Sequence, residues 1–398
     1  MEYRFSNKVS GLKPSAIREI FKSLTDPSII AFAAGNPAAE SFPTEDIKKI
    51  ADKIFSDSSL ATEALQYSVT EGKTHFRDQV AARLKDKFSI GRENDETIIT
   101  TGGQQGLDLA CKVLCNEGDV VICENPSFIG ALNAYRSYGT RLVGVDLEED
   151  GISLEGLENV LKKEKNAKLL YIIPTFQNPT GKTTSLEKRK AVYRLCRKYG
   201  VVILEDNPYG ELRFAGEDVP PIKSFDEEGI VIYSGSFSKI LSAGMRIGFV
   251  CAPQEIVQKM VVCKQTNDVH SNIFFQMVCS QYIDNYDLDA HIAEVRKLYG
   301  RKCGLMIDAM EKYFDDSITF TRPEGGIFVW AAMPEGYDSA ALAREALKRK
   351  VAIVPGSTFN PDSNKASNGF RLNYSTPTDA QITEGIKILS EVMRDFMK

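Results

Sequence analysis

The strongest constraint on the fold is an alternation of short apolar segments with amphipathic segments between about Glu96 and Pro253. The apolar segments are rich in Val, Ile and Leu, and each ends in turn-forming or polar residues. They are ETIITTGG (96–103), DVVICENPS (119–127), RLVGVDL (141–147), KLLYIIPT (168–175), VVILEDNPYG (201–210), GIVIYSGS (229–236) and RIGFVCAP (246–253). Segments with helical periodicity lie between several of them, as in SLEKRKAVYRLCRKYG (185–200). This pattern predicts an α/β fold with a mostly parallel central sheet and helices on both faces.

The last part of the chain has the pattern of a smaller α+β domain. A long helical pattern at 287–314 precedes two predicted strands, at 325–333 and 369–375, which flank a helical segment at 339–350. The first 45 residues indicate a helix and then an extended stretch, IIAFAAGNPAAESFP (29–43), without a core of their own. We therefore expect three parts. They are residues 1–45, packing with the small domain, a large cofactor-binding domain at 46–286 and a small C-terminal domain at 287–398.

Polar or turn-forming residues follow the predicted strands at Gly102–Gln105, Pro126–Phe128, Gln177–Gly181, Asp206–Tyr209 and Ser236–Lys239. Open α/β sheets bind their ligands beyond the carboxyl ends of the strands, so we expect these residues to converge. Lys239 belongs to this set. It lies between hydroxyl residues and a glycine-rich stretch that contains Arg246. A lysine in a loop is usually a solvated charge, but this position favours a chemical role.

Composition argues against several classes of function. The 398-residue chain has a formal net charge of -5 and no long run of like charge, so we expect neither a nucleic-acid nor a membrane partner. No segment approaches the ~20 apolar residues of a membrane span, and the charged N-terminus does not resemble a signal peptide. Eight cysteines without a C-x-x-C motif and three scattered histidines argue against a metal site. Buried free thiols indicate a cytoplasmic protein.

Two Gly-Lys-Thr triplets, at 72–74 and 181–183, invite comparison with nucleotide-binding loops. Such loops need a glycine five residues before the Gly-Lys pair, where this chain has Tyr67 and Phe176. No G-x-G-x-x-G motif follows a predicted strand either. The sequence therefore argues against a nucleotide-driven enzyme.

Five strand-end motifs together resemble a known family. They are TGGQQG (101–106), ENPSFIGAL (124–132), PTFQNPTGK (174–182), EDNPYGELRF (205–214) and SGSFSKILSAGMRIGF (234–249). In order and spacing they are similar to the fold-type I pyridoxal-phosphate enzymes of aminotransferase class I/II, above all the 2-aminoadipate and kynurenine aminotransferases. The resemblance extends from KPSAIREI (13–20) to GFRLNYS (369–375). It implies pyridoxal 5'-phosphate as cofactor and a homodimer with shared active sites.

The resemblance implies that Lys239 holds the cofactor covalently and, once the substrate amine displaces it, moves a proton at the substrate Cα. Asp206 would keep the pyridine nitrogen protonated, which makes the ring an electron sink. Considered alone, Asp206 also fits a helix N-cap or a turn before Asn-Pro. Tyr209 and Asn178 would hydrogen-bond the cofactor's phenolic oxygen, and their alternatives are a packed tyrosine and an Asn-Pro turn.

The same resemblance implies a phosphate site. Gly103 and Gln104 lie where a strand meets a helix N-terminus, so backbone N–H groups and the helix dipole would bind the phosphate. Ser236, Ser238 and Arg246 would complete the site with hydroxyl groups and a guanidinium. Taken singly, the serines also fit simple turns.

Three more residues, Phe128, Tyr67 and Arg371, match family positions. Phe128 would stack on the pyridine ring, and Tyr67 would contact the phosphate of the neighbouring subunit. Arg371 lies inside an apolar strand, where a buried charge needs a partner, and matches the arginine that binds the substrate α-carboxylate. Gly35 would let the backbone approach the same carboxylate, and Asn178 would also contact the substrate.

These features predict an aminotransferase of amino-acid metabolism. We expect 2-oxoglutarate as the acceptor and 2-aminoadipate, aromatic or branched-chain amino acids as donors. The alternatives are a pyridoxal-phosphate-dependent β-lyase or decarboxylase, or a non-catalytic sensor that binds the cofactor. Arg371 argues against decarboxylation, because a carboxylate bound to it is poorly placed to leave. Arg18, in KPSAIREIFKSL (13–24), would pair with the distal carboxylate of an acidic substrate or else be a solvated arginine.

Overall fold

The computed structural model describes residues 3–10, 26–362 and 364–398. Its largest sheet has the strand order β2-β9-β8-β7-β6-β3-β4-β5. The strands are β2 (Asp95–Thr100), β3 (Val120–Asn125), β4 (Arg141–Glu148), β5 (Gly151–Ile152), β6 (Ala167–Ile172), β7 (Val202–Asp206), β8 (Val231–Ser236) and β9 (Gly248–Pro253). Strands β8, β7, β6, β3 and β4 pair in parallel, and β9 pairs antiparallel with both β8 and β2. The predicted mostly parallel sheet is confirmed.

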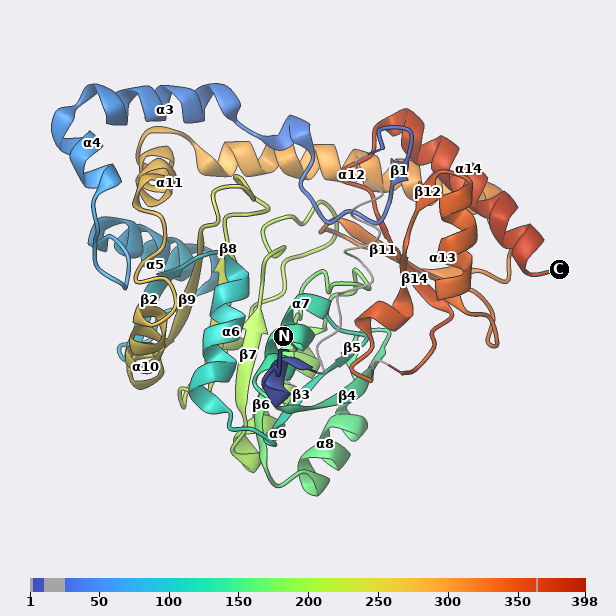
Figure 1. Cartoon of the computed structure of the whole chain (residues 1–398), viewed down its shortest axis with the longest axis horizontal. Coiled ribbons are helices and arrows are strands. Elements are labelled where there is room, and N and C mark those ends of the chain that lie inside the picture. The colour runs from blue at the N-terminus through green and yellow to red at the C-terminus, as the bar shows by residue number, and fades with distance from the viewer. Residues whose placement is uncertain (1–2, 11–25, 363) are drawn as a thin grey trace.

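Both faces of this sheet are apolar, which explains the continuous apolar runs of its strands. Successive residues of a strand point to opposite faces, so Val121 and Leu169 pack on one side while Val120 and Leu170 pack on the other. Helices α6, α7 and α10 cover the first face, and α8 and α9 cover the second (Figure 1). These helices are α6 (Gly103–Leu114), α7 (Ile129–Ser137), α8 (Leu154–Lys163), α9 (Leu186–Tyr199) and α10 (Gln254–Gln265).

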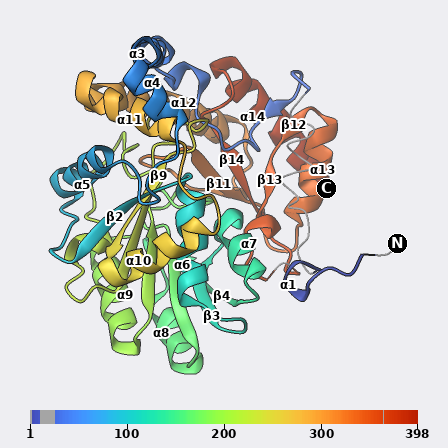
Figure 2. The same cartoon turned by 60° about the vertical axis from the view of Figure 1, so that its left-hand side comes forward.

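Four further helices pack at the β2 edge of the sheet. Helix α5 contacts β2, and α11 contacts α3, α4 and α5 (Figure 2). The bounds are α3 (Thr44–Ser56), α4 (Ser58–Leu65), α5 (Thr74–Phe88) and α11 (Ile273–Asn285). The loop between α10 and α11 therefore lies beside the segment that joins α4 to α5, where Tyr67 and His270 meet edge to face.

A second, antiparallel sheet has the order β10-β11-β14-β13. Its strands are β10 (Thr319–Phe320), β11 (Phe328–Ala332), β13 (Val354–Pro355) and β14 (Gly369–Asn373). Helices α12 (Leu288–Tyr313), α13 (Ser339–Lys348) and α14 (Asp379–Phe396) accompany it. Figure 1 shows α12 crossing the top of the molecule from the side of α11 to α14. The predicted long helix and the strands around β11 and β14 are present.

The extended N-terminal stretch runs along the second sheet. Its strand β1 (Ile30–Ala31) pairs in parallel with β12 (Val351–Ala352). The Phe32 carbonyl accepts a 2.8 Å hydrogen bond from the Asn373 N–H. These bonds place Gly35 next to the Arg371 side chain, which explains how two residues so distant in sequence line one cavity.

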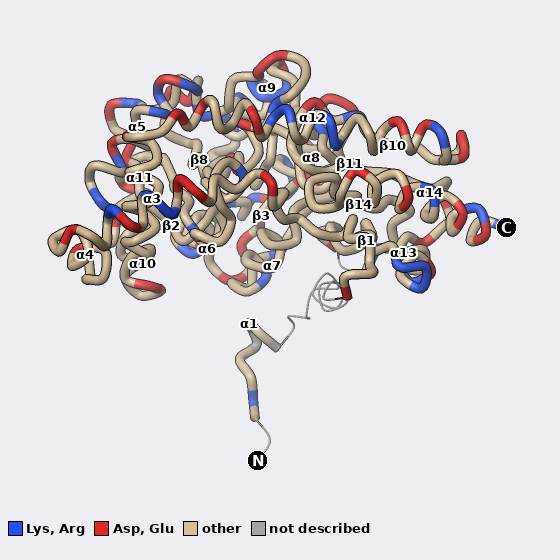
Figure 3. The backbone as a smooth tube through the Cα atoms, turned by 90° about the horizontal axis from the view of Figure 1, so that it is seen from above, with Lys and Arg blue, Asp and Glu red and all other residues tan. Residues whose placement is uncertain are grey.

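The short helical turns are α1 (Asn7–Ser10), η1 (Ala39–Ser41), η2 (Ile222–Phe225) and η3 (Gly356–Phe359). Over the described part of the chain, acidic and basic residues intermingle along the backbone (Figure 3). No helix among these residues has the length and apolar character needed to cross a membrane. All eight cysteines are free thiols.

Candidate active site

A cavity of about 420 Å³ lies at the carboxyl edge of the central sheet, a size typical of small-molecule sites. The residues after β2, β3, β6, β7 and β8 converge there, as the strand-end argument predicts. Twelve of the predicted site residues line the cavity: Gly35, Gly103, Gln104, Phe128, Asn178, Asp206, Tyr209, Ser236, Ser238, Lys239, Arg246 and Arg371.

Lys239 lies in the turn after β8, and its Nζ donates a 2.8 Å hydrogen bond to the Gly35 carbonyl. Burial lowers the pKa of this amine to about 8, and the positive charges of Arg371 and Arg246 act in the same direction. A lysine with such a pKa is partly neutral near pH 7.5, so its nitrogen lone pair is available to attack a carbonyl.

Asp206 ends β7, and its Oδ2 accepts a 2.9 Å hydrogen bond from the Tyr171 hydroxyl. Burial raises the pKa of this carboxyl to about 7, and the bond from Tyr171 opposes that rise. Among the described residues that line the cavity, Asp206 is the one carboxylate. A buried carboxyl of this kind favours a cationic partner, such as a protonated pyridine nitrogen.

Hydrogen-bond donors for an anion gather at the start of α6. Gly102 precedes the helix with φ 73° and no side-chain cap, so the first N–H groups of α6 remain available. The positive φ favours glycine at position 102, and a Cβ there would displace the Arg246 guanidinium. Nearby, the Ser238 N–H donates a 3.1 Å bond to the Ser236 Oγ, and the two hydroxyl oxygens lie 2.9 Å apart.

Arg371 is buried with neutral partners on three sides. Its Nη1 donates to Asn178 Oδ1 at 3.0 Å, and its Nη2 donates to the carbonyls of Ala33 and Ala34 at 3.1 and 3.3 Å. Within the described structure Nε has no hydrogen-bond partner. Burial lowers the pKa of the guanidinium to about 10, so it stays charged at neutral pH. A buried cation with spare donors suits a carboxylate ligand.

Aromatic rings complete the Arg371 surroundings. The Phe328 ring centroid lies 4.0 Å from the guanidinium carbon of Arg371. The Phe328 ring also packs edge to face against the Tyr209 ring, with 5.8 Å between the ring centroids. Asn178 Nδ2 lies 3.5 Å from the Tyr209 hydroxyl oxygen, so Asn178 bridges Tyr209 and Arg371. The three predicted residues therefore form one connected group.

Two predicted residues do not line this cavity. Tyr67 follows α4 with 81% of its surface exposed. Among the aromatic pairs of the described residues, the Tyr67 ring meets only the His270 ring, edge to face at 5.8 Å. Arg18 belongs to residues 11–25, which lie outside the described part of the chain.

Tyr171 and Phe328 also belong to the site and were not predicted from the sequence. Tyr171 is the one residue with a hydroxyl group in the apolar run KLLYII, and that contrast was a usable signal. Phe328 gave no such signal, because its contact with Arg371 depends on the pairing of β11 with β14.

The family model for aminotransferase class I and II matches residues 27–389. The chain belongs to this family. It is similar to aromatic-amino-acid aminotransferase 1 of Thermococcus litoralis, with 39% identity over 401 residues that cover all of this chain and 95% of the relative. It is 38% identical to the 2-aminoadipate transaminase of Thermus thermophilus, with 99% and 97% of the two chains covered.

A solved structure agrees with these relatives. Kynurenine aminotransferase from Pyrococcus horikoshii, in complex with PMP, superposes with a TM-score of 0.95 and 38% identity over 99% of this chain and 98% of that one. As a class I and II aminotransferase, this protein has the fold-type I architecture and uses pyridoxal 5'-phosphate. The sequence-based predictions of fold, enzyme class and cofactor are confirmed.

Proposed function

We propose that this aminotransferase uses 2-oxoglutarate as its amino acceptor and 2-aminoadipate, aromatic or branched-chain amino acids as donors. The names of the relatives, which include aromatic, 2-aminoadipate and kynurenine enzymes, support the aromatic and 2-aminoadipate donors. The observation that carries the proposal is the shared cavity of Lys239, Asp206 and Arg371, with an amine, a carboxyl and a cation around one space.

The residues present fit pyridoxal phosphate. The N–H groups of Gly103 and Gln104, together with Ser236, Ser238 and Arg246, offer donors and positive charge for its phosphate. Asp206 would hold the pyridine nitrogen, and Phe128 would pack on the ring. Tyr209 and Asn178 would donate hydrogen bonds to the phenolic oxygen. When bound, the cofactor withdraws electrons from the substrate Cα and so makes its proton acidic.

In this proposal Lys239 has two tasks. Its amine would hold the cofactor and then, when free, would move a proton from the substrate Cα to C4′ of the cofactor. In the second half of the cycle it would move a proton from C4′ to the Cα derived from the acceptor. The low pKa of Lys239 supports the second task, because a general base is most effective when its pKa lies near the working pH.

Arg371 would bind the substrate α-carboxylate, with Asn178 and Gly35 beside it. A side chain on Gly35 would project toward Arg371 Nη2 and the Phe328 ring, into the space that a carboxylate would use. A carboxylate paired with Arg371 is poorly placed to leave, which favours transamination over decarboxylation.

We also propose a homodimer. Large apolar side chains are exposed around the β2 edge of the molecule, on α3, α4 and α10 and the loops beside them. They are Phe55, Leu65, Tyr67, Val69, Val262 and Val269. A second copy of the chain covering this face would remove them from water and bring Tyr67 to the phosphate site of the partner. The predicted division at residues 45 and 286 likewise stays a proposal.

Two experiments test the function. Incubation of the holoenzyme with 2-oxoglutarate and each amino acid in turn should yield glutamate with the proposed donors. Pyruvate and ammonia without glutamate would indicate a β-lyase, and carbon dioxide release would indicate a decarboxylase. Borohydride reduction followed by mass spectrometry should locate the cofactor on Lys239, and a label on another lysine would overturn the assignment.

A further inference from the structure

A short segment beside the antiparallel sheet is hydrogen-bonded to α7, a helix that covers one face of the central sheet. This junction segment, Phe359–Pro361, begins at the last residue of η3. Arg136, in α7, donates hydrogen bonds from Nη2 to the carbonyls of Asn360 at 3.2 Å and Pro361 at 2.8 Å. The Ser127 N–H, two residues before α7, donates to the Phe359 carbonyl at 2.8 Å. The junction segment is therefore attached at both of its ends.

The Arg136 guanidinium is well defined in orientation. Its Nη1 donates a 3.0 Å bond to Asn133 Oδ1, one turn earlier in α7. The Pro361 ring packs against β4 at Gly144, where a Cβ would lie 2.9 Å from the Pro361 Cγ. Arg136 thus binds a segment that already rests on the central sheet, and it uses backbone carbonyls as acceptors.

Phe359 connects this attachment to Arg371. The Phe359 side chain is fully buried, and its ring centroid lies 5.1 Å from the Arg371 guanidinium carbon, within cation–π range. Trp330, on β11, lies opposite Arg371, on β14, and its ring meets the Phe359 ring edge to face at 6.2 Å. A shift of the junction segment would therefore change the packing around both Arg371 and Trp330.

We propose that Arg136 is a positioning residue for Arg371: by holding the carbonyls of Asn360 and Pro361, it keeps Phe359 packed against the guanidinium that binds the substrate α-carboxylate. The inference rests on the proposed role of Arg371. Arg136 touches neither substrate nor cofactor, because it does not line the 420 Å³ cavity. Its effect passes through two backbone hydrogen bonds and one aromatic ring.

A distinct kinetic signature follows. Every amino acid donor and every 2-oxo acid acceptor carries a carboxylate next to the reacting carbon. Loss of Arg136 should therefore raise KM for donor and acceptor together, by about 5- to 50-fold, and change kcat less than about 3-fold. A defect in cofactor binding would lower the fraction of active enzyme, and so kcat, without this paired rise in KM.

The test compares holoenzyme variants under identical conditions. Arg136→Ala removes both bonds to the junction segment, and Arg136→Lys keeps a cationic donor and should give an intermediate KM. Phe359→Leu removes the ring but leaves Arg136 in place. Arg141→Ala is the matched control, because Arg141 is exposed on β4 and pairs with Glu164 rather than with the junction segment.

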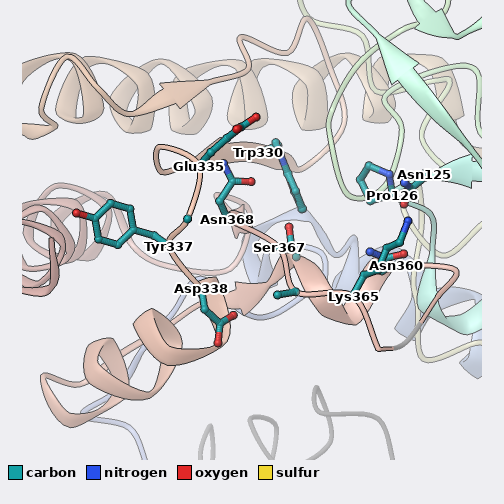
Figure 4. Close-up of a pocket in the computed structure, with 13 residues that line it drawn as sticks. Asn125, Pro126, Trp330, Glu335, Tyr337, Asp338, Asn360, Lys365, Ser367 and Asn368 are labelled. Carbon is teal, nitrogen blue, oxygen red and sulfur yellow. The ribbon is translucent and has the colours of Figure 1, made fainter.

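Trp330 supplies a readout that does not depend on turnover. It is the one tryptophan of the chain, and it lines a second cavity of about 570 Å³ beside the junction segment. Figure 4 shows Trp330 and Asn360 among the residues of that cavity. Acrylamide quenching of its emission should increase in Arg136→Ala and Phe359→Leu, and stay at the wild-type value in Arg141→Ala.

Three outcomes decide the inference. Support requires the paired rise in KM, the change in quenching, and a double variant Arg136→Ala/Phe359→Leu whose KM is no more than about twice that of the weaker-binding single variant. Wild-type KM values in Arg136→Ala, or a multiplicative effect in the double variant, would overturn it. The variant Arg371→Lys distinguishes failure of this inference from failure of the proposed function. An unchanged KM in Arg371→Lys would overturn the proposed role of Arg371 itself.

Discussion

The Tyr171 hydroxyl donates a 2.9 Å hydrogen bond to Oδ2 of Asp206, and both side chains are buried. Tyr171 lies on β6 and Asp206 ends the neighbouring strand β7, so the bond crosses two adjacent strands of the parallel sheet. A hydrogen bond from a neutral hydroxyl stabilises the ionised carboxylate without cancelling its charge. Tyr171 therefore favours the ionised form of Asp206, which the proposed contact with the pyridine nitrogen requires.

Replacement of Tyr171 by phenylalanine tests this relationship. Tyr171→Phe should raise the pKa of Asp206 and lower kcat/KM by about 10-fold, with the acid limb of the pH–activity profile moved to higher pH. Tyr135→Phe is the matched control, since the buried Tyr135 hydroxyl has no hydrogen-bond partner in the described structure and its ring contacts Tyr171. Equal effects of the two variants would assign the loss to packing.

Asp206→Asn should separate function from stability. The folded carboxyl has a pKa raised from 3.8 to about 7, so between these values the folded protein binds more protons than the unfolded chain. The contribution of the Asp206 carboxyl to the free energy of unfolding therefore falls as the pH rises from 3.8 to about 7. The apoprotein of Asp206→Asn should gain about 2–3 kcal/mol over wild type between pH 5 and pH 8, measured by urea unfolding.

The same variant should lose at least about 100-fold in turnover, because the amide cannot hold a protonated pyridine nitrogen by charge. Near-normal turnover would mean that Asp206 is a turn residue. A stability difference that does not change with pH would show that its carboxyl titrates normally.

The reactivity of Lys239 should depend on pH with a midpoint near 8, the pKa that burial and two neighbouring cations produce. Below that value the amine is protonated, so the rate at which the apoprotein takes up pyridoxal phosphate should rise with pH and level off above it. Stopped-flow absorbance measures this rate. Arg371→Gln removes one of the cations and should move the midpoint upward, whereas a wild-type midpoint above pH 10 would contradict the buried environment.

Subunit mixing tests the proposed dimer. Lys239→Ala and a severe Tyr67 variant, both inactive alone, should together recover up to about one quarter of wild-type activity. Half of the randomly exchanged dimers are hybrids, and one of the two sites in each hybrid is intact. Lys239→Ala mixed with Asp206→Asn should recover nothing, because both residues line the same cavity of one chain. No recovery with Tyr67 after proven exchange would exclude a shared site.

The sequence by itself determined the central sheet and the convergence of the strand-end residues at its carboxyl edge. Each apolar run predicts one strand, and parallel strands joined by helices have their carboxyl ends at the same edge of the sheet. For this reason Gly103, Asp206 and Lys239, each at or shortly after the end of a strand, could be predicted to converge. No knowledge of long-range pairing was needed, because the chain direction alone places these residues.

Only the tertiary structure decided what surrounds them. Phe328 and Phe359 meet Arg371 because β11 and β13 pair with β14 in one register, and local sequence patterns do not specify register between distant segments. Nothing in the local sequence distinguishes Arg136 from other helix-surface charges, because its carbonyl acceptors belong to a segment far along the chain. The pKa of Lys239 arises from burial and two neighbouring cations, and that of Asp206 arises from burial opposed by the Tyr171 hydrogen bond. Both depend on the packed molecule rather than on residue type.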